Sequence, residues 1–159
     1  MKRGHTISDF KNIINTFRKH IPEITIWTDV IVGFPGETKE DFLKSKKLIK
    51  RIKPDFVNVS RYSTRENTDA KKMKQLPSEI KKKRSKIMSE LVDKISLEQN
   101  KKWIGKACQV FVDEYNQKNN DYIGRNISYK PVILKKANLG ETRKVKIKGA
   151  IKTGLKGQS

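Results

Sequence analysis

The first part of the chain repeats one pattern of polar and apolar positions. Residues 6–29 and 38–61 align with Thr, Asp, Phe and Pro at matching places. Each copy opens with T-x-x-D, a variant of the capping box that starts a helix, and continues with apolar residues at helical spacing. A proline ends each helix, and segments rich in β-branched residues follow at 24–32 and 56–60. Two such helix–strand units predict parallel strands with right-handed crossovers, hence part of a barrel or of a doubly wound sheet.

A longer helix is predicted from Pro77, with Ser78 as its cap and an apolar stripe that continues to Ile95. The stripe is expected to contact the core. Near the start of this helix lie four basic residues, Lys81, Lys82, Lys83 and Arg84. They fit either a solvated helix face or a phosphate clamp, and we prefer the solvated face.

Beyond about residue 100 the apolar pattern changes to a period of two, which is typical of strands. Alternation over 107–114 is followed by short β-type segments at 122–126, 131–134 and 143–151, separated by turns that contain Asn and Gly. So many short strands in so few residues predict a small closed barrel of the OB type. The expected fold class is therefore α/β followed by all-β.

The chain is strongly basic, with 37 Lys and Arg against 17 Asp and Glu and a formal net charge of +20. Such an excess is typical of proteins that bind nucleic acid, although it also suits solubility alone or binding to anionic lipid. We favour nucleic acid because no apolar stretch is long enough to span a bilayer and because the start, MKRGHT, is no signal peptide. Residues 101–159 hold 14 basic and 4 acidic side chains, so the positive charge is densest there.

Cys108 is the only cysteine, and His5 and His20 lie apart. The chain therefore has no internal disulfide, no cluster bound by several of its own thiolates, and no histidines at metal-ligand spacing. The neighbours of Cys108 predict a strand, in which a small buried thiol is expected rather than a nucleophile. These features indicate an intracellular protein, which we expect in the cytoplasm, without a metal site of its own.

The segment VIVGFPGET, residues 30–38, ends one predicted strand and opens the next helix. Free N–H groups and the helix dipole at such a turn favour the anionic or polar groups of a ligand. The same glycines also suit a plain tight turn in which Glu37 serves the helix dipole, and the spacing alone does not separate the two. No phosphate-loop lysine follows, so a nucleoside triphosphate site is not expected.

Polar residues of the two strands fit a ligand mouth or, in the plainer interpretation, an exposed loop. Thr28 and Asp29 alternate along the first strand, so one of them is expected to point into the space that the sheet encloses. Arg61, Tyr62 and Arg65 follow the second strand at the equivalent end.

In the basic C-terminal part, aromatic and cationic side chains are interleaved as needed to stack unpaired RNA bases and neutralise phosphates. These residues are Tyr122, Arg125, Tyr129 and Lys130. Tyr122 also fits a core position. Arg125 and Lys130, near a turn, are the preferred RNA contacts.

Five motifs carry a resemblance to a known family. They are MKRGHT, TDVIVGFPGETKEDF (28–42), YSTRENT (62–68), MKQLPSE (73–79) and EQNKKWIGK (98–106). Together they resemble the tRNA methylthiotransferases of the radical S-adenosylmethionine (SAM) superfamily, most closely the archaeal and eukaryotic branch that acts on N6-threonylcarbamoyladenosine beside the anticodon. The similarity covers nearly the whole chain.

The resemblance implies an arrangement in three parts. Residues 1–76 would form the C-terminal part of a radical-SAM barrel of partial TIM type, residues 77–100 a connecting helix, and residues 101–159 an OB-like TRAM domain that binds RNA. It implies that Ile31 and Gly33 approach the adenosine of SAM, and that Gly36 and Glu37 shape that loop. The expected contacts with the anticodon arm of tRNA are Arg65, Arg125, Tyr129 and Lys130.

Two features depart from the family pattern. The C-x-x-x-C-x-x-C motif that binds the 4Fe-4S cluster and the cysteines of the family's N-terminal domain are absent, and we expect that this chain starts after the strands that carry them. The chain alone would then be inactive, with no catalytic residue of its own, and would need the missing N-terminal half or a partner chain. In the 62–68 loop the family usually has Pro-Gly before the last threonine, where this chain has Glu66 and Asn67.

These observations leave three functions open. The leading hypothesis is a part of a tRNA methylthiotransferase that supplies one wall of the SAM pocket and the tRNA-binding domain. The alternative is a stand-alone RNA-binding protein in which the barrel remnant is only scaffold. A ribosome-associated basic protein is the third, and it is disfavoured because the helix–strand repeat looks enzymatic.

Overall fold

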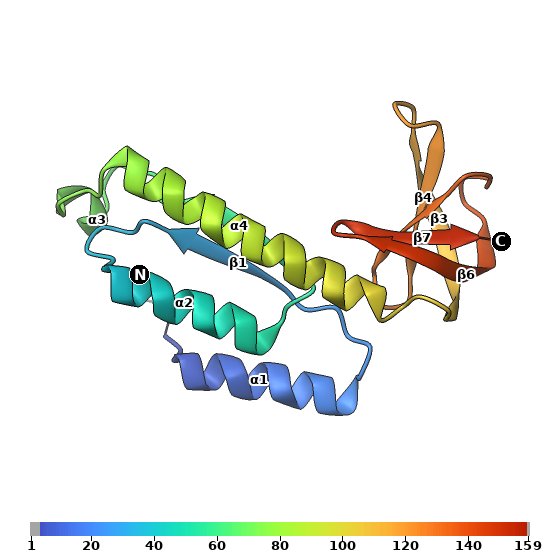
Figure 1. Cartoon of the computed structure of the whole chain (residues 1–159), viewed down its shortest axis with the longest axis horizontal. Helices are drawn as coiled ribbons and strands as arrows, with labels where there is room; N and C mark the ends of the chain where they lie inside the picture. Colours follow the sequence, from blue (N-terminus) through green and yellow to red (C-terminus); the bar gives the residue numbers. More distant parts are fainter. Residues whose placement is uncertain (1–3, 159) are drawn as a thin grey trace. The chain divides into compact units, whose positions relative to one another are not determined.

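A computed structural model describes residues 4–158 of the chain, so the first three residues of the MKRGHT motif lie outside the described part. The chain divides into two units (Figure 1), one formed by residues 27–96 and the other by the segments before and after them. This division falls within the long helix, whereas the three-part division expected from the resemblance gave that helix a segment of its own.

The central unit is built on two parallel strands, as the repeat predicted. They are β1, Trp27–Val32, and β2, Phe56–Arg61, in a register that pairs Trp27 with Phe56 and Val32 with Arg61. Helix α2, Lys39–Ile52, connects them, and the four-residue helix α3, Asp69–Lys72, follows β2. The first strand begins at Trp27, three residues after the expected start. Both strands therefore point their carboxyl ends toward the same edge of the sheet.

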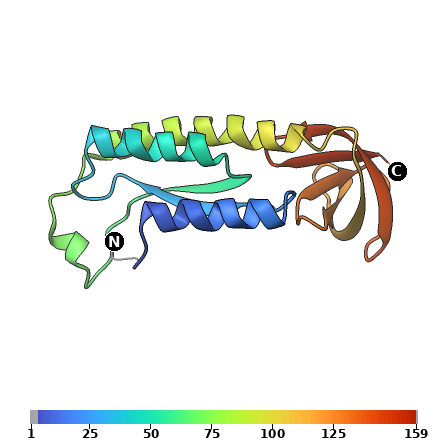
Figure 2. The same ribbon diagram turned by 90° about the horizontal axis from the view of Figure 1, so that it is seen from below.

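Two helices cover one face of this sheet. Helix α2 and the long helix α4, Ser78–Lys101, lie side by side over it (Figure 2). The core between helices and sheet consists of the buried side chains of Val32, Phe42, Ile49, Met88, Val92 and Ile95. Burying these side chains is the main source of stability for a sheet of only two strands. The alternate strand positions, among them Trp27 at 66% exposure, face away from this core.

The helix starts predicted at Thr6 and Thr38 are confirmed in detail. Helix α1, Ile7–His20, and helix α2 each begin with a complete capping box. Thr6 Oγ1 accepts a hydrogen bond from Asp9 N at 3.2 Å, and Thr38 Oγ1 accepts one from Asp41 N at 3.1 Å. The backbone N–H of each threonine donates in return to the aspartate, and these hydrogen bonds hold the pKa of Asp9 and of Asp41 below the ordinary value.

Helix α1 is less buried than its apolar stripe suggests. Ile14 is buried at 5% exposure, whereas Ile13 and Phe17 of the same stripe are 52% and 48% exposed. A stripe of this kind is normally covered in a folded domain. Its exposure means that the described residues leave most of this helix face uncovered.

The C-terminal part of the second unit is a closed five-stranded β-barrel, with neighbouring strands in the order β3-β4-β5-β7-β6. The strands are β3 Ala107–Asn116, β4 Asp121–Asn126, β5 Pro131–Leu134, β6 Thr142–Ile151 and β7 Gly154–Gln158. Only β5 and β7 pair in parallel; the other pairs are antiparallel. The predicted α/β part followed by an all-β barrel is thus confirmed at this level.

The barrel has its own core and one strand that the periodicity did not predict. The core consists of Trp103, Val110, Val112, Val132, Leu134, Val145, Ile147 and Leu155. The missed strand is β7, whose sequence GLKGQ has glycines at two positions and no clear alternation. Gly157 is needed there because a Cβ atom would lie 2.4 Å from Val145 Cγ1 and 2.7 Å from Leu134 Cδ2.

Within residues 4–158, none of the helices is both long enough and apolar enough to cross a membrane.

Candidate functional site

The loop between β1 and α2 is held by hydrogen bonds within its own sequence. The backbone N–H of Gly33 donates to Glu37 Oε2, and Glu37 N donates to Phe34 O at 2.9 Å. Gly33 and Gly36 both have positive φ, at +76° and +83°, a conformation that glycine adopts without steric cost. The loop therefore has one defined shape at the carboxyl end of β1.

Helix α4 fixes this loop from outside. Arg84 Nη1 lies 3.2 Å from Glu37 Oε1 and donates to Glu37 O at 3.0 Å, and both side chains are only 12% exposed. Lys81 packs its aliphatic chain against Gly33, where a Cβ atom would lie 2.4 Å from Lys81 Cγ. The expectation that the basic run forms a solvated face is wrong for Arg84, and it holds for the exposed Lys82 and Lys83.

The other face of the sheet is open and carries polar groups. Ile31 is 38% exposed and pairs in register with Ser60, and the exposed Asp29 pairs with Asn58. Of the neighbouring residues Thr28 and Asp29, Thr28 is half-buried, so Asp29 is the one whose side chain lies on the open face. An exposed aliphatic side chain among hydrogen-bonding groups at the carboxyl ends of parallel strands is typical of a ligand site.

The loop after β2 lies at the same carboxyl end of the sheet as the loop after β1. Tyr62 N donates to Val32 O at 2.9 Å, and the rings of Tyr62 and Phe34 meet edge to face with centroids 5.1 Å apart. Further along, Arg65 is exposed, and Asn67 has a φ of +57°. Asn tolerates this left-handed conformation better than most residues, so the loop keeps a turn where the family usually has Pro-Gly.

On the barrel, the predicted RNA contacts separate into two kinds. Arg125 forms an ion pair with Asp113 at 3.3 Å, and its guanidinium lies 5.4 Å from the ring centroid of Tyr129, which is 68% exposed. Lys130, in contrast, is 1% exposed, and its Nζ donates to Asn100 Oδ1 at 2.9 Å. This burial argues against the predicted direct contact of Lys130 with RNA and suits a structural role instead. Sequence spacing placed Lys130 beside a turn but gave no sign of its partner 30 residues away.

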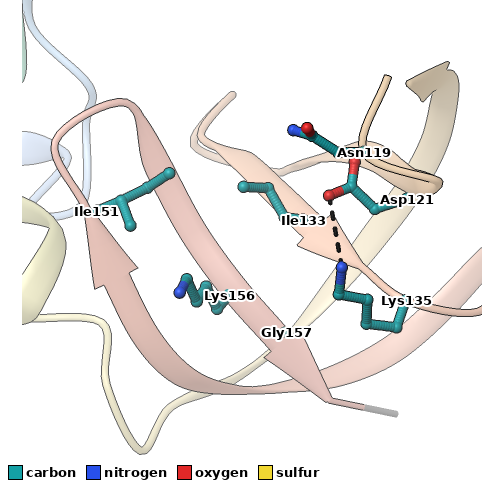
Figure 3. Close-up of a pocket in the computed structure, with 7 residues that line it drawn as sticks. All are labelled: Asn119, Asp121, Ile133, Lys135, Ile151, Lys156 and Gly157. Atoms are coloured by element: carbon teal, nitrogen blue, oxygen red, sulfur yellow. Dashed lines mark ion pairs between the residues drawn. The ribbon is translucent and has the colours of Figure 1, made fainter. Parts of the chain in front are cut away.

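The barrel also carries a pocket of about 500 Å³ that no sequence motif indicated (Figure 3). Its lining comes from the turn before β4, from strands β4, β5, β6 and β7, and from the residue that follows β5: Asn119, Asp121, Ile133, Lys135, Ile151, Lys156 and Gly157. Asp121 is 6% exposed, and its Oδ2 lies 3.9 Å from Lys135 Nζ, beyond hydrogen-bond distance. Its Oδ1 has no hydrogen bond among the described residues. The pocket is therefore lined by a buried carboxylate, two lysines and the aliphatic side chains of Ile133 and Ile151.

Cys108 is half-buried in β3, and burial raises the pKa of its thiol, which keeps it protonated and weakly reactive. Among the residues that the structure describes, no group of three or more His, Cys, Asp and Glu side chains is placed to hold a metal ion. The side chains present here therefore do not fit an iron–sulfur cluster, which requires several thiolates.

The sequence of the chain is similar to those of several tRNA-modifying enzymes. It is 42% identical over 158 residues to the Methanocaldococcus jannaschii protein named "Probable threonylcarbamoyladenosine tRNA methylthiotransferase", covering 99% of this chain and 36% of that protein. A Pyrococcus abyssi protein of the same name is 46% identical, with 99% of this chain and 37% of that protein covered. The Homo sapiens "Threonylcarbamoyladenosine tRNA methylthiotransferase" is 36% identical, with 99% and 27% covered. No family model matches the chain. The chain thus spans between 27% and 37% of the length of these relatives.

Proposed function

The chain is homologous, over nearly its whole length, to a part of the threonylcarbamoyladenosine tRNA methylthiotransferases, and from this premise we propose that it is the C-terminal part of such an enzyme. The complete enzyme would convert N6-threonylcarbamoyladenosine beside the anticodon of tRNA to its 2-methylthio derivative. Within it, the central unit would be the last part of the radical-SAM barrel, and the five-stranded barrel would be the TRAM domain. We propose a cytoplasmic location, which a tRNA substrate would suit.

The observation that carries this proposal is the loop at the carboxyl end of β1. In the proposed role, Ile31 contacts the adenosine of SAM from the open face of the sheet, and Gly33 and Gly36 let the backbone approach it. Glu37, held by Arg84, keeps the loop in one conformation before the cofactor arrives. Such preorganisation raises affinity because no loop ordering remains to be done on binding.

This chain would bind and orient rather than react. SAM, when bound beside an iron–sulfur cluster, supplies the radical chemistry of the superfamily. This chain has a single cysteine, so the cluster ligands would come from residues outside it. The barrel would hold the anticodon arm of tRNA through Arg125 and Tyr129, and Arg65 would contact tRNA from the loop after β2.

The test is tRNA affinity measured across salt concentration, alone and with a cysteine-bearing N-terminal half and SAM. We expect the logarithm of affinity to fall steeply with the logarithm of salt, by about 0.7 to 0.9 per phosphate neutralised. Adding the other half and SAM should raise tRNA affinity and produce SAM binding that depends on this chain. Salt-independent binding would contradict the role of the basic barrel.

One observation favours a second function, a stand-alone RNA-binding protein. The barrel is closed and has its own core, and residues 101–159 carry 14 basic and 4 acidic side chains. In that case tRNA binding would show the same salt dependence, but neither the N-terminal half nor SAM would change it. The experiment above therefore distinguishes the two functions.

A further inference from the structure

The turn between β4 and β5, residues 127–130, presents two large apolar side chains to solvent. Ile127 is 94% exposed and Tyr129 is 68% exposed. Single exposed apolar residues are common on protein surfaces and need no explanation by themselves. This turn differs from ordinary exposed loops in how firmly it is held.

Hydrogen bonds fix the turn at its base. Tyr129 N donates to Asn126 O at 2.8 Å, and Lys130 N donates to Asn126 Oδ1 at 2.9 Å. The buried ammonium of Lys130 donates to Asn100 Oδ1 at 2.9 Å, and Asn100 Nδ2 donates to Ile151 O at 2.8 Å. A buried charge is tolerated only when it is hydrogen-bonded, so this lysine acts as an anchor that ties the turn to the end of β6.

The same turn holds a strained backbone. Tyr129 has a φ of +60°, which is uncommon for a bulky aromatic residue. Strain of this kind persists where the surrounding structure imposes it, and it concentrates at binding sites. The hydrogen-bonded turn thus fixes the backbone from which the Tyr129 ring projects, and the ring lies against the guanidinium of Arg125. A rigid aromatic side chain loses little conformational entropy when a partner stacks on it.

We propose that Ile127 and Tyr129 form a rigid apolar tip that stacks against unpaired bases of the bound RNA. Residues 101–159, which include the barrel, carry 14 basic and 4 acidic side chains. This positive charge favours a polyanion as the partner. Sequence-tolerant RNA binding combines such a positive field with exposed aromatic surfaces for bases. The inference rests on the proposed function and extends it by naming the contacts made to bases rather than to phosphates.

The test uses the full chain with two tip variants, Ile127→Ala and Tyr129→Asn. Asparagine accepts the left-handed conformation, so the second variant removes the ring and keeps the turn. Leu139→Ala is the matched control, because Leu139 is also exposed, at 59%, but lies in the loop between β5 and β6. Affinity is measured for an unmodified tRNA transcript and for an RNA duplex without unpaired bases, over a range of salt.

We expect each tip variant to weaken tRNA binding, about tenfold for Tyr129→Asn, without changing the salt slope. The slope of log affinity against log salt concentration should remain unchanged because an apolar contact releases no counterions. Duplex binding and the Leu139→Ala control should match the wild type. Unchanged tRNA affinity in both tip variants would overturn the inference while leaving the proposed function intact, whereas a wild-type chain that binds no tRNA would overturn both. An equal loss on the duplex, or a tip effect on self-association instead of RNA binding, would also overturn it.

Lys130→Met tests the anchor. Removing the hydrogen bond to Asn100 should loosen the turn and weaken tRNA binding about threefold, again with an unchanged salt slope. A slope reduced by about one phosphate equivalent would mean that Lys130 reaches a phosphate, and the anchored tip would then be wrong.

Discussion

At the scale of single residues, Arg84 has a contact that determines the shape of the candidate site. Its guanidinium is paired with Glu37 at 3.2 Å, bonds the Glu37 carbonyl at 3.0 Å and lies 5.5 Å from the ring centroid of Phe42. Because both charged side chains are only 12% exposed, water can replace little of this interaction if one partner is lost. Nothing in the local pattern distinguishes Arg84 from the exposed Lys82 and Lys83 beside it.

Arg84→Met should destabilise the central unit by about 2–3 kcal/mol, because it leaves the carboxylate of Glu37 without its cationic partner in a poorly hydrated place. Urea unfolding monitored by tryptophan fluorescence measures this change. Lys83→Met, on the exposed side of the same helix, is the control and should change stability little. An equal effect of the two substitutions would contradict the structural role of the Arg84–Glu37 pair.

At the scale of elements, the start of α2 shows how a local motif directs the chain. Thr38 and Asp41 satisfy each other's backbone N–H groups in the first turn, so the helix begins at one defined residue after the loop. That start aligns Phe42 and Ile49 with the sheet, where both are buried. The cap therefore sets both the end of the loop and the packing of the crossover helix.

The cap should make stability depend on pH. Backbone and side-chain hydrogen bonds from Thr38 lower the pKa of Asp41 below 3.8 in the folded state. A lowered folded-state pKa means that the contribution of Asp41 is fully present above pH 3.8 and is lost as the pH falls through the lowered value. The unfolding free energies of wild type and Asp41→Asn should therefore differ at neutral pH and converge in acid. Glu40→Gln, outside the capping box, serves as the control, and a difference that persists in strong acid would contradict this explanation.

At the scale of the whole molecule, each unit has its own apolar core, and the two cores differ in how complete they are. The barrel closes on itself, so the five strands leave no open sheet edge. The central unit has a sheet of two strands with one face exposed, as Trp27 and Ile31 show. Among the described residues each of its strands also has one edge without a neighbouring strand, so in the proposed complete enzyme further strands would pair at those edges and curve the sheet around that face.

Gly157→Ala should destabilise the barrel by about 1–3 kcal/mol, because the new methyl group would overlap the side chains of Val145, Leu134 and Val132. Gly149→Ala is the matched control, since the nearest atom there is Lys156 Cδ at 3.6 Å, an ordinary contact. Thermal unfolding measures stability, and tRNA affinity below the transition should remain near that of the wild type. Equal stability of the two variants would show that the barrel core is not packed as described.

The features that could be predicted from the sequence are those that depend on residues close together in the chain. The capping boxes, the helix–strand repeat, the alternation in the barrel and the dense positive charge are all local or compositional. They were sufficient to predict the loop at residues 33–38 and the order of the elements other than α3 and β7. Which basic side chains are buried depends on contacts between distant parts of the chain. Arg84 meets Glu37 across 47 residues and Lys130 meets Asn100 across 30, and no periodic pattern encodes such pairs. The two glycines of β7 give it little strand preference of its own. This strand forms because it pairs with β5 on one side and β6 on the other, which closes the barrel.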